Sequence, residues 1–248
     1  GQRAEGVDEC LRSYRTGGGA FVTIISVHLP KTAGTSFGTS LTDHFGEGFR
    51  RDYDDQAISK PVALRCREAL TAALDIAEQG LPGVDCVHGH FLPLKYLLLD
   101  TRQDLTFVTW MREPIARLLS HYFYWQTSYD PATSAPHHRR FIEERWTLEQ
   151  FCLSEQFRNI YTQYLWGFPL EKFAFIGINE HYPDELREFS RRYLGIELET
   201  RRENITASTH PRSDLKPDLL EQVRHFHAAD IELYRRAVQL RQARLATP

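Results

Sequence analysis

The sequence has no basic excess, no long apolar run and no secretion-type start. Its 30 Lys and Arg residues are balanced by 33 Asp and Glu residues, for a net charge of −3, whereas proteins that bind nucleic acids generally carry a basic excess. No stretch reaches the roughly 18 apolar residues of a membrane span, and the first residues lack the basic-then-apolar pattern of a signal peptide. We therefore expect no nucleic-acid partner, no membrane span and a cytoplasmic location. The alternative is the soluble luminal domain of a Golgi enzyme.

Cysteine is scarce as well. The four cysteines stand far apart and form no CxxC pair: Cys10, Cys66, Cys86 and Cys152. A chain of this size does not need disulfides to hold a core, and the spacing does not fit a zinc site, so we expect reduced, structural thiols. With 248 residues, 42% of them hydrophobic, the composition is that of one globular domain. We place this domain at residues 20–248, after a polar leader at residues 1–19.

Apolar runs of strand length alternate with helical patterns along the chain. Strands are expected at residues 21–29, 105–111 and 173–178, with a shorter one beginning at residue 84, and helices at residues 36–45, 62–78, 114–125, 182–195 and 217–241. The first run does not alternate apolar with polar residues, which indicates a strand buried on both faces. The order predicts an α/β fold of three layers, with a mostly parallel sheet between helices and ligands beyond the carboxyl ends of the strands.

Two weaker features complete the expected organisation. The polar, proline-broken stretch at residues 128–140 predicts a surface loop. Two histidine pairs, His137 with His138 and His225 with His227, are expected to lie on the surface without a role.

The stretch HLPKTAGTSFGTSL at residues 28–41 places a lysine and several hydroxyls in a turn between a strand and a helix. Free backbone N–H groups at the positive end of a helix bind anions, and glycine permits close approach. Lys31 adds a full charge. Because this lysine precedes the glycine, the turn differs from the GxxxxGK[ST] loop of nucleotide triphosphatases and suits a single phosphate group better. The alternative is a plain capped helix start with a surface lysine.

A second segment, VTWMREPIARLLSHYFYW, carries Arg112 at a strand end and Ser120 about two turns into the next helix. A guanidinium group donates two parallel hydrogen bonds and keeps its charge when partly desolvated. Together the arginine and the hydroxyl can hold a second phosphate. Taken alone, Arg112 and Glu113 also fit an ordinary surface pair.

Together, PKTAGTS at residues 30–36 and REPIARLLSHY at residues 112–122 resemble the paired motifs of sulfotransferases that use 3′-phosphoadenosine 5′-phosphosulfate (PAPS). The similarity is to the carbohydrate (heparan sulfate or uronyl) 2-O-sulfotransferase branch in particular. It implies a P-loop-like strand, loop and helix, whose loop binds the 5′-phosphosulfate through Lys31, Thr32, Ala33, Gly34, Thr35 and Ser36. It also implies that Arg112 and Ser120 bind the 3′-phosphate.

The stretch VHGHF at residues 87–91 supplies a third segment. By the same resemblance, His90 is the catalytic base and His88 lies in the active site. The residue type fits on its own terms, since an attacking alcohol must lose its proton and histidine titrates near neutral pH. A His-x-His pair on a strand can also bind zinc, but no third ligand stands nearby, so no metal is expected. A buried structural His88 is a further alternative.

The stretch ENITASTHPRSDL at residues 203–215 resembles the late loop that covers the nucleotide in this family. The resemblance assigns His210 and Arg212 to the side of the 3′-phosphate and adenine. The lysine-rich version of the loop in glycan-modifying relatives is absent here. A polar stretch before a helix starting at Pro217 is the alternative.

The expected function is transfer of a sulfuryl group from PAPS to an acceptor hydroxyl, with adenosine 3′,5′-bisphosphate (PAP) as product and without a metal. The resemblance favours a sugar or glycan as acceptor, while a small metabolite, a lipid glycan and a tyrosyl peptide stay open. The two rival functions are a small ATP-dependent kinase with an atypical phosphate loop, which would need magnesium ligands, and a nucleotide-binding module without chemistry. The sequence does not indicate which oligomeric state the protein adopts.

Overall fold

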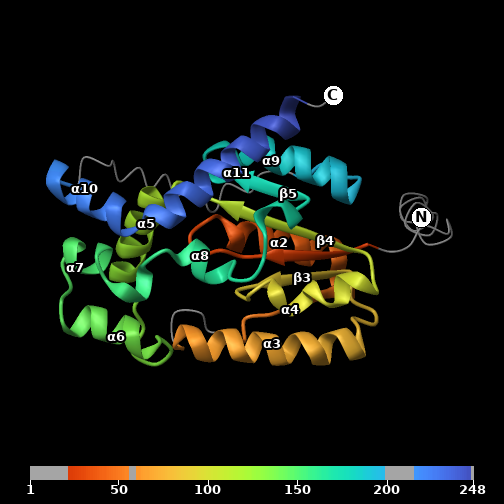
Figure 1. Cartoon of the computed structure of the whole chain (residues 1–248), viewed down its shortest axis with the longest axis horizontal. Coiled ribbons are helices and arrows are strands. Elements are labelled where there is room, and N and C mark those ends of the chain that lie inside the picture. The colour runs from red at the N-terminus through yellow and green to blue at the C-terminus, as the bar shows by residue number, and fades with distance from the viewer. Residues whose placement is uncertain (1–21, 56–59, 199–214, 247–248) are drawn as a thin grey trace, which may run out of the picture.

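The computed structural model describes residues 22–55, 60–198 and 215–246. Its centre is one sheet in the order β2-β3-β1-β4-β5 (Figure 1). The strands are β1 (Thr23–Val27), β2 (Phe49–Arg51), β3 (Cys86–Gly89), β4 (Leu105–Met111) and β5 (Phe175–Ile178). All four neighbouring pairs are parallel. The predicted α/β fold with a parallel sheet is confirmed.

Helices connect the strands and cover the sheet. The α-helices are α2 (Gly34–Phe45), α3 (Val62–Gln79), α4 (Leu94–Leu97), α5 (Pro114–Thr127), α6 (Pro136–Glu143), α7 (Leu148–Cys152), α8 (Ile160–Tyr164), α9 (Tyr182–Phe189), α10 (Pro217–Phe226) and α11 (Ala228–Ala246). Shorter turns include the 3₁₀ turn η5 (Asn179–His181) and the π-helical turn η6 (Ser190–Leu194), which extends α9.

The two faces of the sheet pack against different helices. Ile24 of β1 belongs to a buried cluster with Phe37 of α2 and Leu186 of α9. The next residue, Ile25, belongs to the opposite cluster, which includes Tyr161 of α8 and residues of α4 and α11. Because successive strand residues point to opposite faces, one five-residue strand supplies side chains to both cores. Burial on both faces explains why apolar and polar residues do not alternate along β1 in the sequence.

A separate helical cluster lies beside the sheet. Helices α5, α6, α7 and α10 gather at one end of the molecule (Figure 1) and pack through Trp125, Phe141, Phe151 and Val223. This packing holds α5 beyond the end of β4, and α5 carries Ser120.

Several local predictions differ from the structure. The stretch at residues 128–140 is not all loop, because α6 begins at Pro136, and His138 is buried with Nε2 2.7 Å from the Trp125 carbonyl oxygen. The helix predicted at residues 217–241 is two helices that meet at His227. His227 is also buried, with Nε2 2.8 Å from the Cys152 carbonyl oxygen. The surface assignments of His138 and His227 were wrong because carbonyl groups of other elements hold these rings inside, whereas His225 is exposed as expected.

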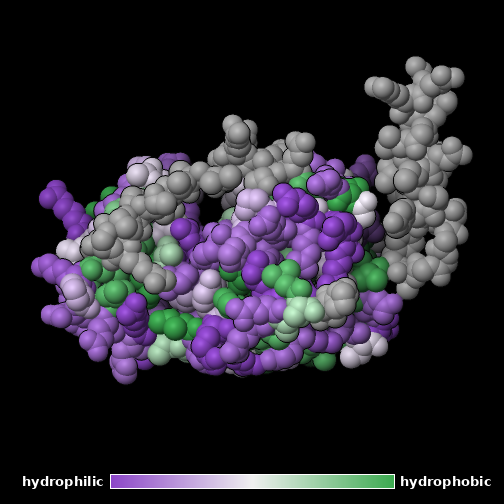
Figure 2. Space-filling view, turned by 90° about the horizontal axis from the view of Figure 1, so that it is seen from above, coloured by the Kyte–Doolittle hydropathy of each residue, from purple (hydrophilic) through white to green (hydrophobic). Residues whose placement is uncertain are grey.

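The face of the molecule seen from above is mainly polar (Figure 2). In the view from above, hydrophilic residues cover most of the described face and hydrophobic residues form smaller areas (Figure 2). Within the described residues, no helix has both the length and the apolar character needed to cross a bilayer.

Candidate active site

The turn from β1 into α2 has an unusual backbone. Lys31 and Ala33 both adopt left-handed conformations with φ 65°, and Ala33 is the N-cap residue of α2. Buried Thr32 braces the turn by donating its hydroxyl to the Leu29 carbonyl at 2.7 Å. Ala33 provides no side-chain cap to α2. The first N–H groups of a helix have no intrahelical partner and lie at its positive end, so this turn suits an anion.

Lys31 extends from this turn toward α5. Its Nζ lies 3.6 Å from the centre of the Tyr124 ring, a cation–π contact. Burial and, secondly, the positive charge of Arg112 lower the pKa of Lys31 to about 8. Two cations from separate motifs thus lie close enough to repel one another, as expected at a binding site for an anion with two charged groups.

Arg112 follows the end of β4, the strand next to β1. It is half-buried, and burial lowers the pKa of its guanidinium group while Glu180 opposes that effect. The start of α5, which follows Arg112, is stabilised because Glu113 caps the helix by accepting the Ala116 N–H at 2.8 Å. Ser120 lies four positions before Tyr124 on α5, so the two share the face of the helix on which Tyr124 contacts Lys31.

His88 is buried at the end of β3, and both its ring nitrogens have partners. Nδ1 lies 2.8 Å from Ser26 Oγ, and Nε2 lies 3.2 Å from the Gly34 carbonyl oxygen. A carbonyl oxygen can only accept, so Nε2 carries the proton and the serine hydroxyl donates to Nδ1. Burial, with the charge of His90 as the next cause, lowers the pKa of His88 to about 3. His88 is therefore a neutral ring that ties β1, β3 and the start of α2 together.

His90 lies just beyond β3 and is partly exposed. Its Nδ1 is hydrogen-bonded to the carbonyl oxygen of His28, so Nδ1 donates and the neutral ring keeps its lone pair on Nε2. Burial lowers the pKa of His90, and the bond to His28 partly offsets this. At neutral pH the ring is therefore uncharged and can accept a proton at Nε2.

His28, directly after β1, completes the group of histidines. Its ring stacks on the His90 ring with centroids 4.1 Å apart, and its Nδ1 lies 3.2 Å from the Tyr53 hydroxyl. A Cβ atom on Gly34 would lie 1.9 Å from the His28 ring, so glycine makes room for this stack. Burial, then the charges of His90, His88 and Lys31, lower the pKa of His28 well below its ordinary value. His28 was not expected to have a role, although its position right after a strand was a signal available in the sequence.

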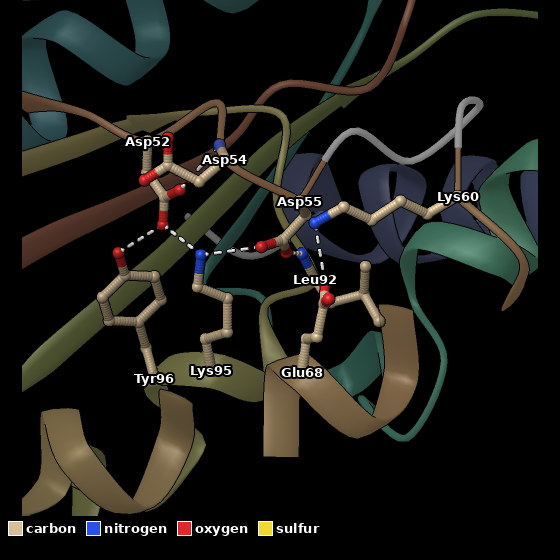
Figure 3. A network of polar contacts seen from close by, with 8 residues as sticks. All are labelled: Asp52, Asp54, Asp55, Lys60, Glu68, Leu92, Lys95 and Tyr96. Carbon is tan, nitrogen blue, oxygen red and sulfur yellow. Dashed lines mark hydrogen bonds and ion pairs between the residues drawn. The ribbon is translucent and has the colours of Figure 1, made fainter. Parts of the chain in front are cut away.

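A buried ionic network lies around Asp52, which directly follows β2, the strand that pairs with β3 (Figure 3). The ammonium group of Lys95 lies 2.7 Å from Asp52 and 2.9 Å from Asp55, and the Tyr96 hydroxyl donates to Asp52 at 2.7 Å. Burial alone would lower the pKa of Lys95, but the two carboxylates more than offset this and raise it. The Asp52 N–H donates to the His88 carbonyl at 3.0 Å. The network thus anchors the segment that carries Tyr53, whose ring lies 5.0 Å from that of His90.

The predicted site residues are distributed as follows. Lys31 lies near enough to Arg112 for that charge to lower its pKa, and the His28 ring, which stacks on the rings of His88 and His90, has its pKa lowered in turn by the charge of Lys31. In the turn from β1 into α2, Thr35 is exposed, whereas Thr32, Gly34 and Ser36 are buried. His210 and Arg212 lie outside the described residues. No group of three or more side chains suited to a metal ion occurs among the described residues.

Comparisons with known proteins find similarity among solved structures. No protein-family model matches the chain, and no curated protein matches it. Among solved structures, the chain is similar to a crystal structure of mouse sulfotransferase SULT7A1 complexed with PAP, with 14% sequence identity and a TM-score of 0.36. The match covers 77% of this chain and 65% of that one, so it leaves about a third of the mouse protein without a counterpart. A likeness this distant does not identify the reaction.

Proposed function

We propose that the protein is a sulfotransferase that moves a sulfuryl group from PAPS to an acceptor hydroxyl. The observation that carries the proposal is the convergence of three strand ends. Lys31 follows β1, His90 follows β3 and Arg112 follows β4, and these strands are adjacent in the sheet. β1 lies where the strand order reverses, and in open α/β sheets ligands bind at this position.

The donor, PAPS, would be bound through its two charged groups, the 5′-phosphosulfate and the 3′-phosphate. The turn at residues 31–36 offers uncapped N–H groups and the Lys31 ammonium group to the 5′-phosphosulfate. Arg112 and the Ser120 hydroxyl would bind the 3′-phosphate, as the resemblance to PAPS-dependent sulfotransferases implies. Thr35 or Ser36 would add a hydrogen bond to the leaving phosphate.

The chemistry would be an in-line displacement at sulfur. The acceptor oxygen forms a bond to sulfur while the bond from sulfur to the phosphate oxygen breaks, and PAP leaves with the electron pair. The acceptor proton passes to Nε2 of His90, the ring nitrogen that has a lone pair. Negative charge grows on the phosphate oxygen, where Lys31 and the N–H groups of the turn stabilise it. His88, neutral and fully hydrogen-bonded, would keep the His90 segment in register with the phosphate turn.

The acceptor would be a sugar hydroxyl. The resemblance to the carbohydrate 2-O-sulfotransferase branch supports this class. The Tyr53 ring, 41% exposed and packed edge-on against His90, offers an aromatic face on which a sugar ring could stack. No metal takes part in this scheme.

The experiment is an acceptor screen with PAPS labelled in its sulfuryl group. Sugars, glycans, phenols and tyrosyl peptides are incubated with the protein, and both labelled product and released PAP are measured. Label on carbohydrate acceptors that depends on His90 would support the proposal. Label confined to phenols or peptides would contradict the carbohydrate assignment, and the absence of transfer to every class would contradict the reaction.

A further inference from the structure

The turn that carries Arg112 is held by the side chain of a distant tyrosine. The Tyr161 hydroxyl accepts the N–H of Arg112 at 3.0 Å and donates to the carbonyl oxygen of the same residue at 2.7 Å. Tyr161 is fully buried at the start of α8. Burial raises the pKa of its phenol, so the hydroxyl keeps the proton that it donates. One side chain thereby satisfies both backbone groups of the residue that would bind the 3′-phosphate.

The next peptide unit is held by a second route. The Glu113 N–H donates to Glu180 Oε1 at 2.8 Å, and Glu180 Oε2 accepts the hydroxyl of Tyr234 at 3.0 Å. Glu180 lies in η5 after the edge strand β5, and Tyr234 lies on α11. The backbone groups of Arg112 are therefore tied to Tyr161, 49 residues later in the sequence, and the Glu113 N–H is tied to Glu180, 67 residues later.

Tyr161 is itself held in place by α11. The buried carboxylate of Asp230 accepts the N–H groups of Tyr161 and Thr162, each at 2.9 Å, and so caps α8 from another helix. The guanidinium carbon of Arg117 lies 5.6 Å from the centre of the Tyr161 ring. The hydroxyl is thus fixed at the end of a chain of contacts that runs from α11 through α8 to the turn after β4.

We infer that Tyr161 is a positioning residue that aims the Arg112 side chain and thereby sets the preference for a nucleotide with a 3′-phosphate. The inference rests on the proposed function. Binding through an arginine on a mobile turn orders both the backbone and the side chain, and a backbone fixed beforehand leaves only the cost of ordering the side chain. Because the benefit reaches the ligand only through Arg112, it affects the 3′-phosphate and not the rest of the nucleotide.

The alternative is that Tyr161 only packs in the core. Removal of its hydroxyl distinguishes core packing from the positioning of Arg112. Phenylalanine fills the same space without bonding to Arg112. Tyr193→Phe is the matched control, since it removes a hydroxyl that donates to the Ala174 carbonyl at 2.8 Å near the amino end of β5, away from the strand ends of the site. If Tyr161 only packed the core, both changes would alter stability and leave nucleotide preference alone.

The test is calorimetric binding of PAP and of adenosine 5′-phosphate to the wild-type protein, Tyr161→Phe and Tyr193→Phe. Arg112→Ala gives the full loss of preference for comparison. In Tyr161→Phe we expect the Kd for PAP to rise about tenfold, the usual scale for leaving a buried polar group unpaired, while the Kd for adenosine 5′-phosphate stays within about twofold. Tyr193→Phe should change neither.

The outcomes separate the inference from the proposed function. Equal weakening of both ligands in Tyr161→Phe, or no weakening, would overturn the inference while a wild-type preference for PAP keeps the proposed function. A wild-type protein without that preference would overturn the donor assignment itself. Thermal unfolding checks that each variant is folded. Should Tyr161→Phe not fold, Asp230→Asn weakens the bonds that hold Tyr161 in place, and an unchanged preference for PAP in this variant counts against the inference whereas a selective loss supports it.

Discussion

His90 holds its proton on the ring nitrogen that faces the main chain. The bond from Nδ1 to the His28 carbonyl leaves Nε2 as the basic atom, and burial keeps the ring neutral at physiological pH. In His90→Asn we expect the turnover number to fall by roughly 10² to 10⁴, the usual contribution of a positioned base. Donor affinity, measured by calorimetry, should stay the same. Wild-type turnover in this variant would remove His90 from the mechanism.

The acidic side of the pH profile reports on the same group. Only the neutral ring accepts a proton, and the pKa of His90 lies below the usual 6.5. The rate should therefore rise with pH through a value below 6.5 and level off by neutrality. Measurement of kcat/KM against pH checks this, and a rise centred above 6.5 would show that a different group, or a charged His90, controls the rate.

The ionisation of Lys31 should determine how kcat/KM changes at alkaline pH. Its pKa of about 8 means that the free protein loses this charge as the pH rises through that value. The kcat/KM for the donor should therefore fall above pH 8, since it reports the ionisation of the free enzyme. Lys31→Arg keeps a charge at all these pH values and should lack the alkaline fall, whereas Lys31→Ala should lower the turnover number by about 10² or more at every pH. An unchanged alkaline fall in Lys31→Arg would assign it to another group.

At the start of α2, Gly34 lies against the ring of His28, and its carbonyl oxygen is hydrogen-bonded to His88. Alanine normally stabilises a helix relative to glycine by up to about 1 kcal/mol, but here its Cβ would lie 1.9 Å from the His28 ring. We expect Gly34→Ala to lower both the melting temperature and the turnover number because the ring must move. Thr39→Ala, which removes an exposed hydroxyl from the same helix, is the control. A Gly34→Ala variant more stable than wild type would show that the ring is not confined.

The Lys95 network should matter for stability. Lys95 and Asp52 each have side chains only 7% exposed. Lys95→Met leaves two buried carboxylates without their cation, which typically costs about 3–5 kcal/mol in the free energy of unfolding. Lys60 pairs with Glu68 on the surface at 2.7 Å, so Lys60→Met should cost less than about 1 kcal/mol. Urea unfolding measures both, and similar losses would show that burial of the network has little energetic weight.

The sequence predicted the elements that carry strong local signals. β1, β4 and β5 were found because their apolar runs are buried on both faces, and α3 and α5 because of helical spacing and prolines at their starts. β2 was missed because its three residues, FRR, lie at the sheet edge and are mostly exposed. The break between α10 and α11 depends on contacts of His227 with residues about 70 positions away. His28 and Tyr161 were not recognised as site residues for the same reason, since their partners are far apart in sequence.

For the whole molecule, strand order determines where the site lies. The chain runs from central β1 outward on one side and then returns to build the other, so the three motifs meet at neighbouring strand ends although about 80 residues separate Lys31 from Arg112. The net charge is −3, and the cations of the site are therefore a local concentration within a slightly acidic protein. Binding of an anionic nucleotide should depend on this concentration and weaken as salt screens it.

The central claim is that the convergent strand ends bind a nucleotide with a 3′-phosphate and a 5′-phosphosulfate. Its most direct test is calorimetric titration of the protein with PAP and with ATP, each with and without magnesium. We predict that PAP binds more tightly than ATP and that its affinity does not depend on magnesium. Tighter binding of ATP, strengthened by magnesium, would contradict the account and indicate a kinase.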